Sequence, residues 1–213
     1  MRHTAALIAA TTLIAVPVIA QQAMTRPGSK NPALVTAGSY TVDPGHTLVE
    51  WTVDHMGFTP YFGLFGDITG KLTLDPKKLS AATVTVTIPV SKITTVNAAL
   101  TAHLTRPSAS GGKPDFFGPA AADATFVSTS VVPSGAQKAK VTGNLTLNGV
   151  TRPVILDAEF YGAGKTPPQM GGKEALGFTA KGVIKRSAFG LGFGVPVVGD
   201  DVTLKIAAGF TKD

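Results

Sequence analysis

Three histidines and the acidic residues near them are the side chains of this chain best suited to chemistry. His46, His55 and His103, with Asp43 or Asp54 close in sequence, could hold a catalytic metal or act as acid and base. Metal-binding histidines usually stand at short spacings such as H-E-x-x-H, which the sequence lacks, and no serine lies in a G-x-S-x-G turn. We therefore expect no catalytic residue, no metal site and no cofactor. A metal- or acid/base-assisted hydrolase that uses these histidines is kept as an alternative.

His55 belongs to an alternating segment over residues 49–55. Trp51, Val53 and His55 share one face, and charged or hydroxyl side chains occupy the other. This pattern predicts that His55 is buried beside Trp51. A buried imidazole needs hydrogen-bond partners and is most stable when neutral. His55 is therefore either a structural histidine inside the protein or a contact to the polar head of a ligand.

Two arginines lie where apolar strands are expected to end. Arg152 shares the apolar face of its strand close to a turn, and Arg186 directly follows an apolar strand. Each could donate a forked pair of hydrogen bonds to a phosphate or carbonyl group of a ligand. Each could equally be solvated where the strand leaves the sheet, and the sequence leaves both interpretations open.

Phenylalanines occur both in loops and on expected strands. Phe116 and Phe117 lie in a Gly/Pro-rich segment over residues 107–119, and Phe189 and Phe193 lie among glycines. Aromatic side chains in such loops form a lid or pocket rim, or pack the loop against the end of the fold. Two further phenylalanines fall on apolar strand faces, where they would form core or pocket wall: Phe126 and Phe178.

The pair Asn148-Gly149 is the strongest turn signal in the chain. Both residues tolerate the positive φ angles of a two-residue hairpin turn, which sets Leu147 opposite Val150. The opposite face of this hairpin is polar, so one face is built for a core and the other for water. The core face consists of Val141, Gly143, Leu145, Leu147, Val150, Arg152, Val154, Leu156, Ala158 and Phe160.

Alternation of this kind recurs from Ser39 onward and predicts about eight strands, with one short helix over residues 97–104. The expected fold class is therefore all-β, a single antiparallel barrel whose interior holds one small ligand. Charged side chains near the centres of the polar faces exclude an outer-membrane barrel, whose outward face must be apolar. Three glycines on the apolar faces are expected to leave room inside the barrel: Gly70, Gly143 and Gly182.

The chain divides into three expected segments. Residues 1–20 have the basic start, apolar stretch and small cleavage-site residues of a signal peptide, so the mature chain should begin near Gln21. An uncleaved membrane anchor is the alternative. Residues 21–38 contain prolines, glycine and asparagine and are expected to be a flexible lead-in, and residues 39–213 form the barrel.

Composition limits the partners. The chain has 19 basic and 13 acidic residues and no cysteine, which excludes disulfides and thiolate metal sites. The positive charge is scattered and lacks interleaved aromatic residues, so no nucleic-acid binding is expected. It is compatible with a weak contact to the anionic surface of a membrane.

Residues 143–154 resemble the G-x-L-T-x-x-G-V-T-x-P-V signature of the YceI-like family. Further stretches match the family pattern in order across residues 39–211, among them the opening at 40–47, Phe116-Phe117, the run at 186–192 and the closing Gly199-Asp200-Asp201-Val202. Leu100, Thr101 and Gly118 depart from the pattern and remove charged groups that the family usually has near the helix.

The resemblance implies a lipocalin-like barrel that binds a long-chain lipid, a polyisoprenoid, an isoprenoid quinone or a related molecule, in the periplasm. It also suggests a homodimer. A ligand-free structural or stress-related envelope protein, with a barrel filled by its own side chains, is the alternative. The residues expected to line the ligand are Trp51, Val53, His55, Phe65, His103, Leu104, Phe116, Phe117, Phe126, Leu145, Arg152, Leu156, Phe178, Arg186 and Phe189.

Overall fold

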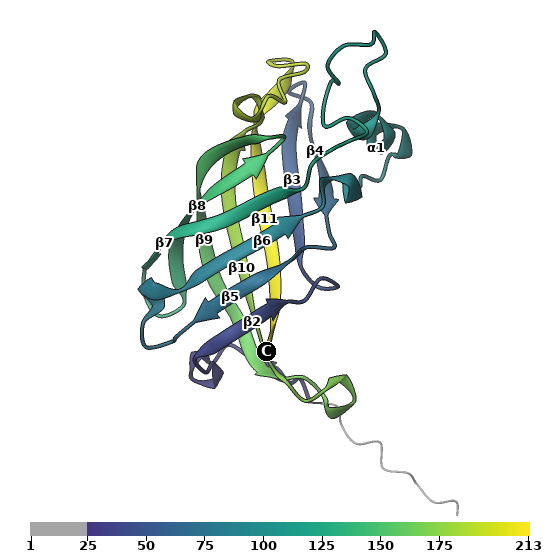
Figure 1. The fold of residues 1–213 in the computed structure, drawn as a ribbon. Coiled ribbons are helices and arrows are strands. Elements are labelled where there is room, and N and C mark those ends of the chain that lie inside the picture. The colour runs from purple at the N-terminus through teal and green to yellow at the C-terminus, as the bar shows by residue number, and fades with distance from the viewer. Residues whose placement is uncertain (1–24) are drawn as a thin grey trace, which may run out of the picture.

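The centre of the computed structural model, which describes residues 25–213, is a closed ring of antiparallel strands. Strand β11 pairs with β2 on one side and β10 on the other, and β10 pairs with β9, which closes the ring (Figure 1). The prediction of a single antiparallel eight-stranded barrel is thereby confirmed. In ring order the strands are β2 (Gly38–Val42), β5 (Thr69–Leu74), β6 (Thr83–Ile88), β7 (Ala124–Pro133), β8 (Lys138–Leu147), β9 (Val150–Lys165), β10 (Glu174–Lys185) and β11 (Val198–Lys212).

Three further strands extend the ring. Strand β3 (Leu48–His55) pairs with the first half of β11, and β4 (Thr59–Phe65) pairs with β3 to form a hairpin. Strand β1 (Gly28–Ser29) pairs with β9. The segment over 49–55 was expected in the barrel wall but belongs to this hairpin, and β2 takes its place in the ring. Strand β4 was not predicted because apolar residues stand on both of its faces, which removes the alternation that marks a strand.

The hairpin of β8 and β9 has the predicted register. Leu147 lies opposite Val150, and Asn148 and Gly149 adopt φ angles of 53° and 75°. Val154 and Leu145 of the apolar row are buried, whereas Ile155 on the opposite face is 56% exposed. The sequence therefore predicts correctly which face of this hairpin lines the interior.

Helix α1 (Ala98–Thr105) is the short helix expected over 97–104. The side chain of Asn97 accepts a hydrogen bond from the backbone N–H of Leu100 and caps its first turn. Figure 1 shows α1 at the same end of the barrel as the tip of the β3–β4 hairpin. The remaining helical turns are η1 (Pro32–Leu34), η2 (Leu79–Ala81), η3 (Val90–Lys92), η4 (Pro168–Met170) and η5 (Arg186–Phe189).

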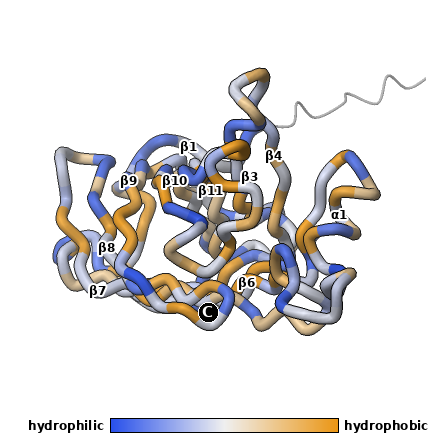
Figure 2. The backbone as a smooth tube through the Cα atoms, turned by 90° about the horizontal axis from the view of Figure 1, so that it is seen from above, coloured by the Kyte–Doolittle hydropathy of each residue, from blue (hydrophilic) through white to orange (hydrophobic). Residues whose placement is uncertain are grey.

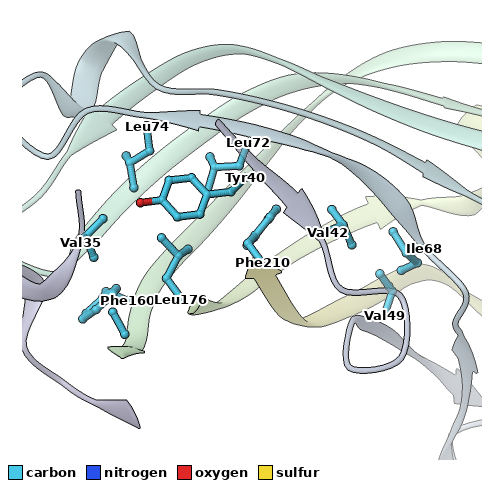
Figure 3. Packing of buried hydrophobic residues seen from close by; sticks show 11 residues of the cluster. Val35, Tyr40, Val42, Val49, Ile68, Leu72, Leu74, Phe160, Leu176 and Phe210 are labelled. Carbon is cyan, nitrogen blue, oxygen red and sulfur yellow. The ribbon is translucent and has the colours of Figure 1, made fainter. Parts of the chain in front are cut away.

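A dense apolar cluster lies at the other end of the barrel (Figure 3). Its centre is Tyr40, which is fully buried and packs among residues from β2, β5, β9, β10 and β11. The hydroxyl of Tyr40 donates to Glu174 Oε1 at 2.6 Å. Burial, followed by the hydrogen bond to Glu174, raises the pKa of Tyr40 to about 12.

The segment over residues 28–37, which we name the strap, is ordered and packs on the end of the barrel opposite α1. Gly28 and Ser29 pair with β9, and Val35 is only 8% exposed. Thr36 donates to Glu174 through its backbone N–H at 2.8 Å and its hydroxyl at 2.7 Å. This part of the expected flexible lead-in is therefore held in place, because its partner Glu174 is remote in sequence and could not be recognised from the segment itself.

Acid should loosen the strap through Glu174. Burial raises the pKa of Glu174, but the hydrogen bonds from Tyr40 and Thr36 and the charge of Lys212 more than offset this and hold it below its ordinary value. A carboxyl with a lowered folded pKa stabilises the fold above its unfolded pKa, and this stability disappears as the pH falls through the folded value. Glu174→Gln should therefore lower the free energy of unfolding by about 1–2 kcal/mol at neutral pH. It should also reduce the loss of stability that the unchanged protein shows as the pH falls.

Urea unfolding between about pH 3 and pH 7 measures this dependence. The matched control is Asp157→Asn, since Asp157 is 71% exposed and pairs with Lys140 of β8, away from the strap. If Glu174→Gln loses as much stability in acid as the unchanged protein does, another group controls the strap.

The three glycines expected to leave room inside the barrel instead mark tight contacts. A Cβ atom on Gly143 would lie 2.3 Å from Phe126 Cζ and 2.7 Å from the carbonyl oxygen of Val127. On Gly182 it would lie 2.7 Å from Leu156 Cδ2. Gly70 has a φ of +151° and would meet Thr85 O at 2.2 Å. That expectation was wrong, because neighbouring side chains and backbone already occupy the space.

Gly143→Ala should therefore destabilise the barrel by about 1–3 kcal/mol through overpacking. Gly177→Ala is the control, because the nearest atom to a Cβ there is Ala208 O at 3.6 Å, an ordinary contact. Chemical unfolding of the two variants measures the difference. Equal stabilities of the two variants would contradict the prediction, because they would mean that Phe126 and β7 move aside for the added methyl group without loss of stability.

The predicted signal peptide and its cleavage position lie outside the described residues. Within residues 25–213 no helix has the length and apolar character needed to cross a membrane.

Candidate functional site

The barrel interior contains two apolar chambers stacked end to end. The lower chamber, at the strap end, has a volume of about 340 Å³, and the upper chamber, beneath α1, about 520 Å³. Figure 2 looks at the molecule from above, with α1 to one side of the strands. Four residues line both chambers and form a waist between them: Val49, Ile88, Leu145 and Leu204.

Alanines on neighbouring strands provide the room in the lower chamber. Ala139 of β8 lies opposite Ala158 of β9, and Ala158 lies opposite Ala180 of β10. All three line the chamber, as does Ala208. Short side chains side by side on three strands leave a recess that longer aliphatic residues would fill.

A lid of three segments covers the upper chamber. His103 of α1 bonds through Nε2 to Asp115 Oδ2 at 2.7 Å, and Asp115 lies in the loop that follows the helix. The ring of His103 meets Phe116 and Phe193 edge to face at 5.3 and 5.8 Å between centroids. One histidine thus joins α1, the loop over 106–119 and the loop over 190–197.

Arg186 holds the loop over 190–197 from inside. It is only 7% exposed and donates to four backbone carbonyl oxygens, those of Leu191, Phe193, Val198 and Gly199, at 2.6 to 2.9 Å. Burial lowers the pKa of its guanidinium, and nearby Asp200 opposes that shift. Arg186 lines the upper chamber, but its donors are largely occupied by the protein. It is not the solvated residue that one interpretation of the sequence expected.

Trp51 and His55 line the upper chamber, as their shared face predicted, but at different depths. Trp51 is half-buried, and a Cβ on Gly63 would lie 2.5 Å from its ring, so β4 covers the indole. Its Nε1 is the one buried side-chain nitrogen or oxygen in residues 25–213 without a hydrogen-bond partner. His55 is exposed at the chamber rim because β3 ends there. The expectation of a buried His55 was wrong.

Thirteen of the fifteen expected ligand residues line a chamber, and Arg152 and Phe189 do not. Arg152 is exposed, with Nε 3.5 Å from Ala188 O. Phe189 is 2% exposed and belongs to a core cluster. The lower chamber has Phe126, Leu145, Leu156 and Phe178, and the upper chamber has Trp51, Val53, His55, Phe65, His103, Leu104, Phe116, Phe117, Arg186 and again Leu145.

Sequence reasoning missed Tyr61 and Leu191 among the upper-chamber residues. Tyr61 lies on β4, which alternation did not reveal, and its ring centroid lies 6.5 Å from that of Trp51. Leu191 is held by Arg186, a contact that the local sequence does not indicate. Phe193, whose position among glycines suggested a lid or pocket rim, lines the upper chamber.

The histidines do not converge on a metal site. Among residues 25–213 no group of three His, Cys, Asp or Glu side chains is placed to hold an ion. His46 bonds to Asp43 at 2.7 Å and lines neither chamber. His55 and His103 both line the upper chamber, but His103 is engaged with Asp115.

A family model described as the YceI-like domain matches residues 40–210 of this chain. The chain belongs to the YceI-like family. Protein YceI of Salmonella arizonae and that of Salmonella heidelberg are each 39% identical to it over 158 residues, which cover 73% of this chain and 77% of theirs. The YceI-like domain therefore coincides with the ring of strands and both chambers.

Solved structures of similar shape include two at moderate identity. BcnA of Burkholderia cenocepacia aligns with a TM-score of 0.66 and 26% identity, covering 79% of this chain and 98% of BcnA. The YceI protein of Campylobacter jejuni aligns with 0.61 and 30%, covering 75% and 90%. A polyisoprenoid-binding domain from Saccharophagus degradans aligns with 0.58 and 12%, covering 82% and 98%, which is a likeness of fold alone.

Proposed function

We propose that this YceI-like protein binds one long apolar lipid inside the barrel, with the tail extending from the upper chamber through the waist into the lower one. The observation that carries the proposal is the end-to-end arrangement of two apolar chambers that share Val49, Ile88, Leu145 and Leu204. Removing apolar surface from water contributes roughly 25 cal/mol per Å², which favours a chain-like ligand over a compact one in such a space. The polyisoprenoid-binding domain of the same fold supports an isoprenoid tail.

The polar head of the ligand belongs at the upper end in this proposal. The upper chamber contains the polar or titratable side chains His55, Tyr61, Asn97 and His103. Arg186 is a less suitable head-group contact because four backbone carbonyls already accept its hydrogen bonds. His55 and Tyr61, which line the upper chamber near its entrance, are better placed to meet a carbonyl, hydroxyl or phosphate group.

The proposed role is sequestration without a reaction, and the proposed place is the bacterial envelope. The basic and apolar start of the sequence supports export. The homodimer suggested by the family resemblance stays a prediction.

Organic extraction of the purified full chain, followed by mass spectrometry, tests the proposal. We expect one isoprenoid or comparable long-chain lipid per chain. Trp51 is the only tryptophan and lines the upper chamber, so its fluorescence should shift when a lipid analogue is added to stripped protein. Elemental analysis is run on the same sample. Stoichiometric metal without lipid would favour the hydrolase, and neither lipid nor metal would favour the ligand-free protein.

A further inference from the structure

Large apolar side chains are exposed at one end of the barrel, around the upper chamber. Met56 and Phe58 at the β3–β4 turn are 48% and 86% exposed. Phe193, Val195 and Val197 in the loop over 190–197 are 50%, 36% and 59% exposed. We name these five residues the rim. Contiguous exposed apolar surface of this kind marks an interaction site rather than ordinary surface.

The two halves of the rim lie side by side. Val198 at the end of the loop pairs with His55 at the end of β3, and a Cβ on Gly199 would lie 3.2 Å from Asp54 Cβ. In Figure 1 the tip of the β3–β4 hairpin and the loop before β11 share the end of the barrel that carries α1.

Both halves of the rim are held by hydrogen bonds. The backbone N–H of Phe58 donates to His55 O, and that of Gly57 donates to Asp54 Oδ2 at 2.9 Å. In the loop, the N–H of Val198 donates to Gly194 O at 2.8 Å, and Arg186 binds Phe193 O. The exposed side chains are thus presented by fixed backbone.

The rim is continuous with the lining of the upper chamber. Phe193 lines the chamber and is also half exposed, and the paired residues His55 and Val198 line the chamber too. A molecule that enters from this end therefore passes between apolar side chains from the surface inward.

The charges near the rim are of both signs. The carboxylates of Asp115 and Asp201 are paired with His103 and Lys185, whereas those of Asp54 and Asp200 accept hydrogen bonds from Gly57 and Ser187. Lys113 and Arg152, next to η5, donate instead to the backbone carbonyls of Gly190 and Ala188. Basic side chains that are free of carboxylate contacts add attraction to anionic head groups.

We propose that the rim inserts into the surface of a lipid bilayer, with Phe58 as its deepest residue. Two projecting loop tips fit a deformable lipid surface, whereas a second protein copy seated on the rim would cover the chamber entrance. The use of this contact for moving lipid between bilayer and barrel rests on the proposed function. The docking itself can be tested without a ligand.

The absence of cysteine from the chain allows a clean test. Phe58→Cys carries an environment-sensitive fluorophore, and Ile155→Cys is the control, since Ile155 is 56% exposed on the outer wall of β9. With vesicles of phosphatidylcholine and phosphatidylglycerol, emission from position 58 should increase and shift to the blue, and emission from position 155 should not change. Vesicles of phosphatidylcholine alone separate the apolar contribution from the charge contribution.

Flotation with the same vesicles gives the size of the effect. Phe58→Ser should lower the partition coefficient by about tenfold or more, whereas Ile155→Ser should leave it unchanged. An unchanged label at position 58, or no flotation of the full chain, would overturn the proposal. So would loss of a dimer on Phe58→Ser in sedimentation, without vesicle binding, because the rim would then join two copies.

The Trp51 response to a lipid analogue in solution distinguishes the two proposals. Lipid binding without flotation would overturn the docking and leave the lipid-binding function intact. Flotation without lipid binding would do the reverse. Circular dichroism of each variant verifies that the barrel is folded.

Discussion

Arg186→Met should destabilise the protein by about 3 kcal/mol, because it removes the donors to four backbone carbonyls, two in the loop over 190–197 and two at the start of β11. Methionine fills a similar volume, so the loss reflects hydrogen bonds more than packing. In a domain of this size the loss corresponds to a fall of about 10 °C in Tm. The loop over 190–197 should also detach from the lid, which leaves Phe193 without a fixed place over the upper chamber.

Arg152→Met is the matched control for this prediction. Arg152 is exposed and makes one long contact, 3.5 Å from Nε to Ala188 O. Its loss should change stability by no more than about 0.5 kcal/mol. Thermal unfolding of the two variants decides the matter, and equal Tm values would show that the loop folds without its central guanidinium.

Ala180→Trp should block the lower chamber and shorten the ligand that the barrel accepts. Ala180 lines this chamber between Ala158 and Ile206 on the neighbouring strands. A tail excluded from the chamber loses about 0.8 kcal/mol for each methylene left in water, so several methylenes amount to about 100-fold in affinity. A short-tailed analogue confined to the upper chamber should bind as before.

Affinity is measured with radiolabelled isoprenoid alcohols of increasing length. Tryptophan fluorescence is unsuitable here, because the signal of the introduced Trp would overlap that of Trp51. Val183→Trp is the control, since Val183 lies on the same strand and is 59% exposed. Ala180→Leu is a milder variant for the case in which tryptophan impairs folding. Full affinity for the long-tailed ligand in folded Ala180→Trp would exclude the lower chamber from the site.

The sequence predicts the barrel well where the two faces of a strand differ. The β8–β9 hairpin is correct in turn and register because Asn148-Gly149 fixes the turn and the apolar row fixes the face. Strand β4 escapes prediction because Tyr61 and Phe62 face opposite sides and are both aromatic. Periodicity carries information only through contrast between the faces.

The candidate site is predictable in outline, and its depth is not. Trp51, Val53 and His55 do share the inward face. His55 is nevertheless exposed, because it stands at the end of β3, where the pairing with β11 stops. Glycine in a strand does not by itself indicate open space, because the sequence does not show what the neighbouring strands place there. Phe126 occupies the space beside Gly143, and the room in the lower chamber is provided by the alanines of β8, β9 and β10.

The role of Arg186 could not be derived from its neighbours in sequence. Its acceptors are backbone carbonyls, and any residue type supplies those. Only the path of the chain through the loop over 190–197 into β11 brings four of them to one guanidinium.

The place of β11 in the ring has a consequence for how the molecule is made. Its residues pair with β2 and β3, which lie near the opposite end of the chain, and the last residue, Asp213, is hydrogen-bonded to Lys71. Pairing between segments so remote in sequence is slow, because the loop between them must first be closed. A growing chain therefore cannot complete its barrel before β11 has been synthesised, and until then both chambers lack the part of their lining that β11 supplies.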